Sequence, residues 1–324
     1  MPTISVIIPA YNAERTILET IQSIQQQTFQ DFELIVINDG STDRTLEILN
    51  QINEPRLKVF SYNNGGLPTA RNRGISNASG EFISFIDADD LWTADKLESQ
   101  LMALQQNPNA GVAYSWTLNM RDEGQSVSFA QGASSTLEGN VYQDLLLGNF
   151  IGSGSNILIR RSVIEMIGEF EPTMKSFEDW DFYLRAAAKC EFVVVPKPQI
   201  LYRQTSQSMS SKVDVMEKEG LRAIERAYQA APLEIQYLRN KSLAFLYRYC
   251  AGLCLANNID AKLLKYAQEK LWIAVKLYPP ILRERYAQNL ITKLLVKRVL
   301  PDSVSQLVIS VLKKPFSRRD PRLH

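Results

Sequence analysis

The first two-thirds of the chain alternates short apolar runs with longer stretches in which apolar residues recur at helical spacing. Nearly every position of each short run is apolar, which is typical of a strand buried on both faces of a parallel sheet. These runs are residues 4–8, 34–37, 57–61 and 82–86, and the helical stretches between them are residues 14–27, 43–52 and 71–77. Strands that alternate with helices at this spacing predict βαβ units and a mostly parallel sheet flanked by helices.

The pattern changes twice further along the chain. After strand-like runs at 112–116, 157–159 and 192–195, long helical patterns follow at 221–230, 243–255, 263–277 and 281–300. Residues 119–140 are rich in Ser, Gly and Gln with little periodicity, and we expect a mobile surface insertion there. The sequence therefore predicts an α/β domain over residues 1–212 and a helical C-terminal region over residues 213–324.

Composition and charge narrow the class of protein. With 45% hydrophobic and 22% charged residues, the 324-residue chain can bury a sizeable core. The net charge of +1 argues against a general nucleic-acid binder. The charge is uneven, however, because residues 291–324 carry +6 and the rest about −5. Apolar residues between these cations are typical of a helix on an anionic membrane surface. A solvated helix followed by a disordered basic tail fits equally well.

Histidine and cysteine usage excludes several kinds of chemistry. The only histidine is His324, so neither a Ser-His-Asp triad nor a histidine-ligated zinc site is expected, and a general base should be a carboxylate. Three cysteines are too few for a disulfide framework and favour a reducing compartment. With no basic signal-peptide start and no stretch of about twenty apolar residues, we expect a cytoplasmic protein.

Three carboxylates follow the apolar run 82–86: Asp87, Asp89 and Asp90. Neighbouring carboxylates repel one another, and packing gives no reason to place them at the end of a buried strand. Hard cations such as Mg²⁺ and Mn²⁺ take oxygen ligands, and ligands bind beyond the carboxyl ends of strands in open α/β sheets. The cluster therefore suggests a metal site, although a polar loop, or a helix cap at Asp90, is the simpler alternative.

Two further polar residues stand near strand ends. Asp39 directly follows the run 34–37, where its carboxylate could accept hydrogen bonds from a ribose or a base edge, or could simply stabilise a turn before glycine. Arg71 follows the Gly65-Gly66 turn, where a guanidinium could bind phosphate oxygens, or could lie on a solvated helix face.

A second acidic cluster, Glu178 and Asp179, lies among aromatic residues. Aromatic neighbours desolvate a carboxylate and raise its pKa toward neutral pH, as a general base requires. The alternative is that both acids open an amphipathic helix and complement its dipole.

Four segments resemble, in the same order, the motifs of family 2 glycosyltransferases. They are Ser5–Asn12, Val36–Asp43, Gly66–Gly74 and Phe85–Asp90. This resemblance implies the GT-A fold, a nucleotide-binding α/β domain that transfers sugars from nucleotide-sugar donors with inversion. The motifs end before the C-terminal helices, so the resemblance covers roughly the first two-thirds of the chain.

The resemblance also implies roles for individual residues. Pro9, Tyr11 and Asp39 would face the nucleotide base, Arg71 would lie near the diphosphate, and Asp87 with Asp89 would form the Asp-x-Asp element. Asp90 is a further acid of the motif, and whether Asp89 or Asp90 is the main ligand of the Mn²⁺ or Mg²⁺ ion is left open. Asp179 would be the base, supported by Glu178. Where many relatives carry a histidine after Arg203, this chain has Thr205.

Together these features predict a cytoplasmic, metal-dependent inverting glycosyltransferase with a helical C-terminal appendage. We expect a donor that is most often a UDP-sugar, a glycan or lipid-linked acceptor, and a role in making cell-surface polysaccharide. The helical region could form a homodimer contact, and the basic tail a peripheral contact with the inner face of the membrane. One alternative is a catalytically silent nucleotide-sugar or glycan-binding module. Another is a sugar nucleotidyltransferase, which would need a Gly-rich phosphate loop where this chain has Pro9–Asn12.

Overall fold

The computed structural model describes residues 1–122, 127–204, 212–256 and 261–300. Its contacts divide the chain into two compact units. The first comprises Met1–Met209 and Lys218–Gln236, and the second Ser210–Glu217 and Tyr237–His324. Helix α8 (Val213–Ala230) therefore contributes to both units. Its residues from Lys218 onward group with the α/β unit, whereas the sequence predicts that the helical region begins at residue 213.

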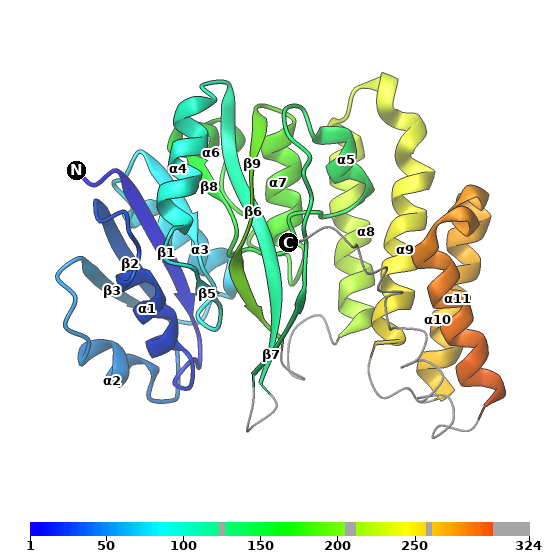
Figure 1. Ribbon diagram of the computed structural model, residues 1–324, viewed down its shortest axis with the longest axis horizontal. Helices are drawn as coiled ribbons and strands as arrows, with labels where there is room; N and C mark the ends of the chain where they lie inside the picture. The colour runs from blue at the N-terminus through cyan, green and yellow to red at the C-terminus, as the bar shows by residue number, and fades with distance from the viewer. Residues whose placement is uncertain (123–126, 205–211, 257–260, 301–324) are drawn as a thin grey trace, which may run out of the picture. The chain divides into compact units, whose positions relative to one another are not determined.

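The first unit is built on a nine-stranded sheet (Figure 1). Its strands are β1 (Ile4–Ala10), β2 (Phe32–Asp39), β3 (Leu57–Tyr62), β4 (Phe82–Phe85), β5 (Leu91–Trp92), β6 (Ala110–Asp122), β7 (Val127–Gln131), β8 (Leu158–Arg160) and β9 (Glu191–Arg203). Its helices besides α8 are α1 (Ile17–Gln25), α2 (Thr45–Asn50), α3 (Leu67–Asn77), α4 (Lys96–Gln106), α5 (Tyr142–Leu147), α6 (Arg161–Ile167) and α7 (Glu178–Ala187). The 3-10 turn η2 (Leu233–Leu238) contributes residues to both units.

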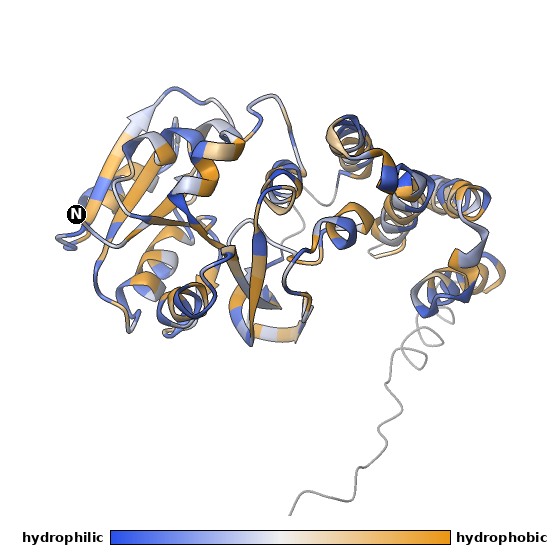
Figure 2. Ribbon diagram, turned by 90° about the horizontal axis from the view of Figure 1, so that it is seen from above, coloured by the Kyte–Doolittle hydropathy of each residue, from blue (hydrophilic) through white to orange (hydrophobic). Residues whose placement is uncertain are grey.

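The strand order is β3-β2-β1-β4-β8-β6-β9-β5, with β7 paired to β6. Strands β3, β2, β1 and β4 are mutually parallel, so their carboxyl ends meet at one edge, as the sequence predicts. Every residue of β1 and β2 is buried, which explains their continuous apolar runs. Apolar side chains of these strands pack with those of α1 and α4 in one core, and Figure 2 shows the strands as largely hydrophobic ribbons.

The prediction of an irregular insertion at residues 119–140 is wrong for the first half of this segment. Strand β6 continues to Asp122, and β7 pairs with it antiparallel, with Asn119 opposite Ala130. All five residues of β7 are exposed, so this strand has no buried face to impose an alternating pattern on the sequence. Asp90 does not cap a helix either, because α4 begins only at Lys96.

The second unit is helical. It contains α9 (Arg239–Cys254), α10 (Ala261–Leu277), the 3-10 turn η3 (Pro279–Arg283) and α11 (Arg285–Val299). Cys250 and Cys254 are buried free thiols of α9. Over the residues that the structure describes, every helix falls short of the length and hydrophobicity needed to span a membrane.

Candidate active site

The three carboxylates that follow β4 lie in different environments. The side chains of Asp87 and Asp89 are partly exposed, whereas Asp90 is fully buried. Asp90 Oδ1 accepts a hydrogen bond from the backbone N–H of Arg203 at 2.9 Å, and Oδ2 accepts one from Ser155 Oγ at 2.5 Å. Burial and the charges of Asp89 and Asp87 raise the pKa of Asp90 well above its ordinary value. Asp90 thus connects its loop to the end of β9 and to the segment that precedes β8.

Arg203, at the end of β9, also contacts this loop through its side chain. Its Nε donates to the backbone oxygen of Asp89 at 2.8 Å, and its Nη2 forms an ion pair with Glu19 at 2.6 Å. These contacts place Arg203 against the acidic segment. Thr205, which stands where many relatives carry a histidine, lies outside the described residues.

Arg71 on α3 links the two acidic clusters. Its Nη2 lies 2.7 Å from Asp87 Oδ1, and its Nη1 lies 2.7 Å from Glu178 Oε1. The side chain is only 1% exposed and packs against the ring of Phe170. Burial alone would lower the pKa of Arg71, but the charges of Asp87 and Glu178 raise it above its ordinary value. Both terminal nitrogens bind carboxylates in this structure, and the expected contact of Arg71 with a diphosphate stays a prediction.

Asp179 lies in the first turn of α7. Phe177, just before the helix, has a left-handed backbone with φ of 58°, which turns the chain into α7. Asp179 Oδ1 accepts the N–H of Trp180 at 2.7 Å, and Oδ2 accepts a hydrogen bond from Asn149 Nδ2 at 3.1 Å. Burial and the neighbouring Glu178 charge raise the pKa of Asp179 to about 7. A partly exposed carboxylate with this pKa suits a general base at neutral pH.

The residues expected at the nucleotide base lie at the ends of β1 and β2. Pro9 is in β1 opposite Ile37, and Tyr11 follows the strand with 54% of its surface exposed. Asp39 is buried, and its carboxylate accepts the N–H groups of Gly65 and Gly66 at distances between 2.8 and 3.1 Å.

Arg73 Nη1 contacts the same Asp39 carboxylate at 2.6 Å. Asp39 therefore fixes the glycine turn before α3 in this structure. Its contact with a nucleotide, like those of Pro9 and Tyr11, stays a prediction.

The carboxylates fit a hard cation. Asp89 makes no ion pair within the described residues, and burial together with the Asp87 charge raises its pKa to about 6. Carboxylate oxygens without an ion-pair partner are donors that Mg²⁺ and Mn²⁺ prefer. In the described part of the chain no group of three or more His, Cys, Asp or Glu is arranged around a common metal position. Two carboxylates suffice where waters and a diphosphate complete the coordination sphere.

The loop between α5 and β8 was missed as part of the site. It carries Asn149, which contacts Asp179, and Ser155, which donates a hydrogen bond to Asp90 and accepts one at its Oγ from the backbone N–H of Asp87. Serines and asparagines near glycines indicate a loop in the sequence, and no local pattern shows which distant carboxylates they meet.

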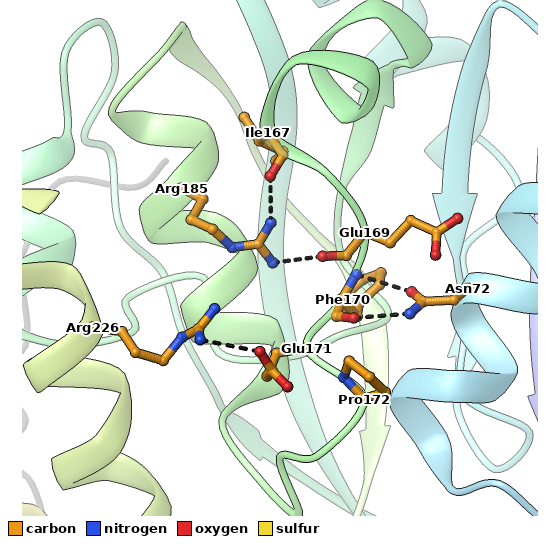
Figure 3. Close-up of a pocket in the computed structure, with 8 residues that line it drawn as sticks. All are labelled: Asn72, Ile167, Glu169, Phe170, Glu171, Pro172, Arg185 and Arg226. Carbon is orange, nitrogen blue, oxygen red and sulfur yellow. Dashed lines mark hydrogen bonds and ion pairs between the residues drawn. The ribbon is translucent and has the colours of Figure 1, made fainter.

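A pocket of about 400 Å³ lies elsewhere in the first unit (Figure 3). It is lined by Asn72, Ile167, Glu169, Phe170, Glu171, Pro172, Arg185 and Arg226. Asn72 exchanges hydrogen bonds with the backbone of Phe170, and Arg226 forms an ion pair with Glu171, so polar groups of its wall bind one another. Neither the carboxylates that follow β4 nor the pair Glu178 and Asp179 line it.

Comparison with known proteins agrees with this geometry. The model of a family described as "Glycosyltransferase like family 2" matches residues 5–251, and the chain belongs to this family. A Bacillus subtilis protein named "Putative teichuronic acid biosynthesis glycosyltransferase TuaG" is 31% identical over 250 residues, which cover 74% of this chain and 96% of that protein. An uncharacterized glycosyltransferase of Haemophilus influenzae is 46% identical over 110 residues, which cover 33% of this chain and 44% of that protein.

Solved structures show the same fold. The S. aureus TarS fragment 1–349 superposes with a TM-score of 0.59 at 23% identity, covering 89% of this chain and 87% of that one. The Pyrobaculum calidifontis mannosyltransferase PcManGT, solved with GDP-Man and Mn²⁺, superposes with a TM-score of 0.57 at 16% identity, covering 91% of this chain and 87% of that one. The predicted GT-A fold with a C-terminal helical region is therefore confirmed.

Proposed function

We propose that this protein is an inverting glycosyltransferase that moves a sugar from a UDP-sugar to a hydroxyl group of a glycan or lipid-linked acceptor. The observation that carries the proposal is the position of Arg71, which forms ion pairs of 2.7 Å with both Asp87 and Glu178. This guanidinium joins the acids expected at the donor diphosphate to the acids expected at the acceptor. A silent binding module needs only one of these clusters.

Each acidic cluster has its own part in the proposed reaction. The acceptor hydroxyl gives its proton to Asp179 Oδ2 while its oxygen forms a bond to C1 of the sugar. The bond between C1 and the diphosphate oxygen breaks on the opposite side, and the leaving nucleotide takes the electron pair, so the configuration at C1 inverts. Asp87 and Asp89 would hold Mn²⁺ or Mg²⁺, which supplies positive charge to the diphosphate of the leaving nucleotide.

The names of relatives support the donor and the biological role. A matching Escherichia coli protein is named as a glucosyltransferase that uses UDP-Glc on a GlcNAc-diphosphoundecaprenol acceptor, and it is 40% identical over 105 residues. TarS has been solved with UDP-GlcNAc. TuaG is named for teichuronic acid biosynthesis. We therefore assign the protein to polysaccharide biosynthesis in the cytoplasm, with a lipid-linked or glycan acceptor.

Contact with a membrane is the second part of the proposal. Near the end of α11, Leu295 and Val299 are 55% and 75% exposed beside the exposed Arg298. This arrangement and the +6 charge of residues 291–324 support binding to an anionic membrane surface. We expect the protein to float with vesicles that contain phosphatidylglycerol and to remain unbound with pure phosphatidylcholine. Equal flotation with both vesicles, or with neither, would contradict this part. A homodimer stays a prediction.

Transfer is tested by the release of UDP. The purified protein is incubated with Mn²⁺ and UDP-glucose or UDP-GlcNAc, with water as the acceptor, and UDP is measured over time. We expect Asp179→Asn to slow the release of UDP by about 10²–10⁴-fold, which is the usual contribution of a general base. Asp144→Asn, in the first turn of α5, is the matched control and should release UDP at the wild-type rate. A normal rate in Asp179→Asn would contradict the assignment of the base.

A further inference from the structure

The loop between α5 and β8 brings one neutral side chain to the proposed base. Asn149 Nδ2 lies 3.1 Å from Asp179 Oδ2. We propose that Asn149 is a positioning residue for Asp179: it orients the carboxylate toward the acceptor and stabilises its charged form. The inference rests on the proposed function, because it concerns the residue to which that proposal gives the acceptor proton.

The orientation of the Asn149 amide follows from its contacts. Its Oδ1 accepts the backbone N–H groups of Ile151 and Gly152, both at 3.2 Å. An amide nitrogen cannot accept a hydrogen bond, so a flipped side chain would leave both N–H groups facing another donor. The Nδ2 group must therefore point toward Asp179. The two backbone N–H groups of the loop thus fix the orientation of the amide, so that a hydrogen-bond donor faces Asp179.

The charges around Asp179 make this donor important. Glu178 and Asp87 repel the Asp179 carboxylate, Arg71 attracts it, and Tyr183 also acts on it through its phenol group. Within the described residues, Asn149 supplies the only side-chain hydrogen bond to Asp179, and the N–H of the residue after Asp179 supplies a backbone one. Since both donors favour the ionised form, they work against the burial that raises the pKa.

The loop that carries Asn149 is anchored on the rest of the site. Ser155 holds Asp90, as described above, and the oxygen of Ser153 accepts a hydrogen bond from the hydroxyl of Tyr183 at 2.9 Å. At Gly154 an added Cβ atom would lie 2.3 Å from Arg71 Nη2, so only glycine allows the loop to pack this closely. A loop fixed at several points can hold Asn149 in one position relative to Asp179.

Removing the amide should change the titration of Asp179 in a defined direction. Asn149→Ala deletes a hydrogen bond to the charged form only, so the proton affinity of Asp179 rises. A hydrogen bond of this length to a partly exposed carboxylate accounts for about a tenfold change, or about one pKa unit. The acidic limb of the UDP-release profile should move to higher pH by the same amount, and the rate should recover at high pH.

The direct test is carbon-13 NMR of the full chain labelled at the aspartate carboxyl carbons, with Asp179 assigned from its missing signal in Asp179→Asn. We expect Asp179 to titrate near pH 7 in the wild type and about one unit higher in Asn149→Ala. The matched control is Asn140→Ala, which removes an exposed asparagine whose Oδ1 accepts the N–H of Tyr142. This control should titrate like the wild type.

A second variant keeps the test decisive if Asn149→Ala does not fold. Asn149→Asp preserves an oxygen for the N–H groups of Ile151 and Gly152 but turns a carboxylate oxygen toward Asp179, so the upward shift should be larger. An unchanged titration of Asp179 in both variants would overturn the inference.

The two proposals fail in different ways. If the wild type and Asp179→Asn release UDP at the same rate while the Asp179 signal shifts in Asn149→Ala, the assignment of the base fails and the contact between Asn149 and Asp179 stands. If Asp179→Asn is inactive but the Asn149 variants keep the wild-type titration and pH profile, only the positioning role fails.

Discussion

Replacing Arg71 by methionine should cost far more stability than replacing any other arginine of α3. Arg71 is 1% exposed and forms two ion pairs of 2.7 Å, with Asp87 and Glu178. Removing one partner of a buried ion pair leaves an uncompensated charge and destabilises a protein by about 3–5 kcal/mol. Because the side chain of Asp87 is 25% exposed and can bind water, we expect a loss near the lower end, about 3 kcal/mol.

Arg73 provides a matched control on the same helix. It also pairs with a carboxylate, Asp39, but its side chain is 25% exposed. Asp39 keeps the backbone N–H groups of two glycines when Arg73 is removed. We therefore expect Arg73→Met to cost about 1 kcal/mol. Adding Glu178→Gln to Arg71→Met should restore part of the lost stability, since it removes one of the two charges left unpaired.

The assay is equilibrium unfolding in urea followed by tryptophan fluorescence. Trp272 is the tryptophan that belongs to the second unit, so a Trp272→Phe background leaves only the three tryptophans of the first unit to report. The free energies of unfolding of the variants are compared in this background. If Arg71→Met and Arg73→Met agree within about 0.5 kcal/mol, the claim that Arg71 holds the two acidic clusters together is refuted.

Three further predictions concern other charged groups. The rate of sugar transfer should rise as the pH increases through about 7, because Asp179 must lose its proton before it can act as a base, and a rate that is flat from pH 5 to 9 would contradict this. Lys96 is fully buried, which lowers its pKa well below the ordinary 10.5, so the unfolded chain binds more protons and the wild type should gain stability as the pH rises toward 10.5. Lys96→Met should abolish this gain, and an unchanged pH dependence of urea unfolding would refute the reasoning. Asp90→Ala should cost about 1–3 kcal/mol because it leaves a buried N–H unpaired, whereas Asp89→Ala should leave the free energy of unfolding nearly unchanged; equal losses would contradict the different environments of the two carboxylates.

Much of the fold follows from local patterns. The continuous apolar runs of β1, β2 and β4 predict buried parallel strands, and the polar residues after them predict an edge where ligands bind. The hairpin of β6 and β7 could not be predicted in this way, because its exposed strand has no buried face and hence no periodicity.

In the candidate site, too, some residues can be predicted from local sequence patterns and others cannot. Asp87, Asp89 and Asp179 stand out in the sequence because acids interrupt apolar surroundings. Asn149 does not, because its contact with Asp179 spans 30 residues and depends on how a loop packs. The paired state of Arg71, which lies 107 residues from Glu178, depends equally on tertiary structure. Sequence patterns thus indicate candidate groups for the chemistry, and the fold determines which other groups contact them.

The most direct test of the central claim is the calorimetric titration of the purified protein with UDP and the other nucleoside diphosphates, in Mn²⁺ and then in chelator. The account predicts that one nucleotide, UDP, binds in Mn²⁺, and that chelator or the substitution Asp89→Ala abolishes this binding. A folded protein that binds no nucleoside diphosphate, or that binds UDP equally well in chelator, would contradict it.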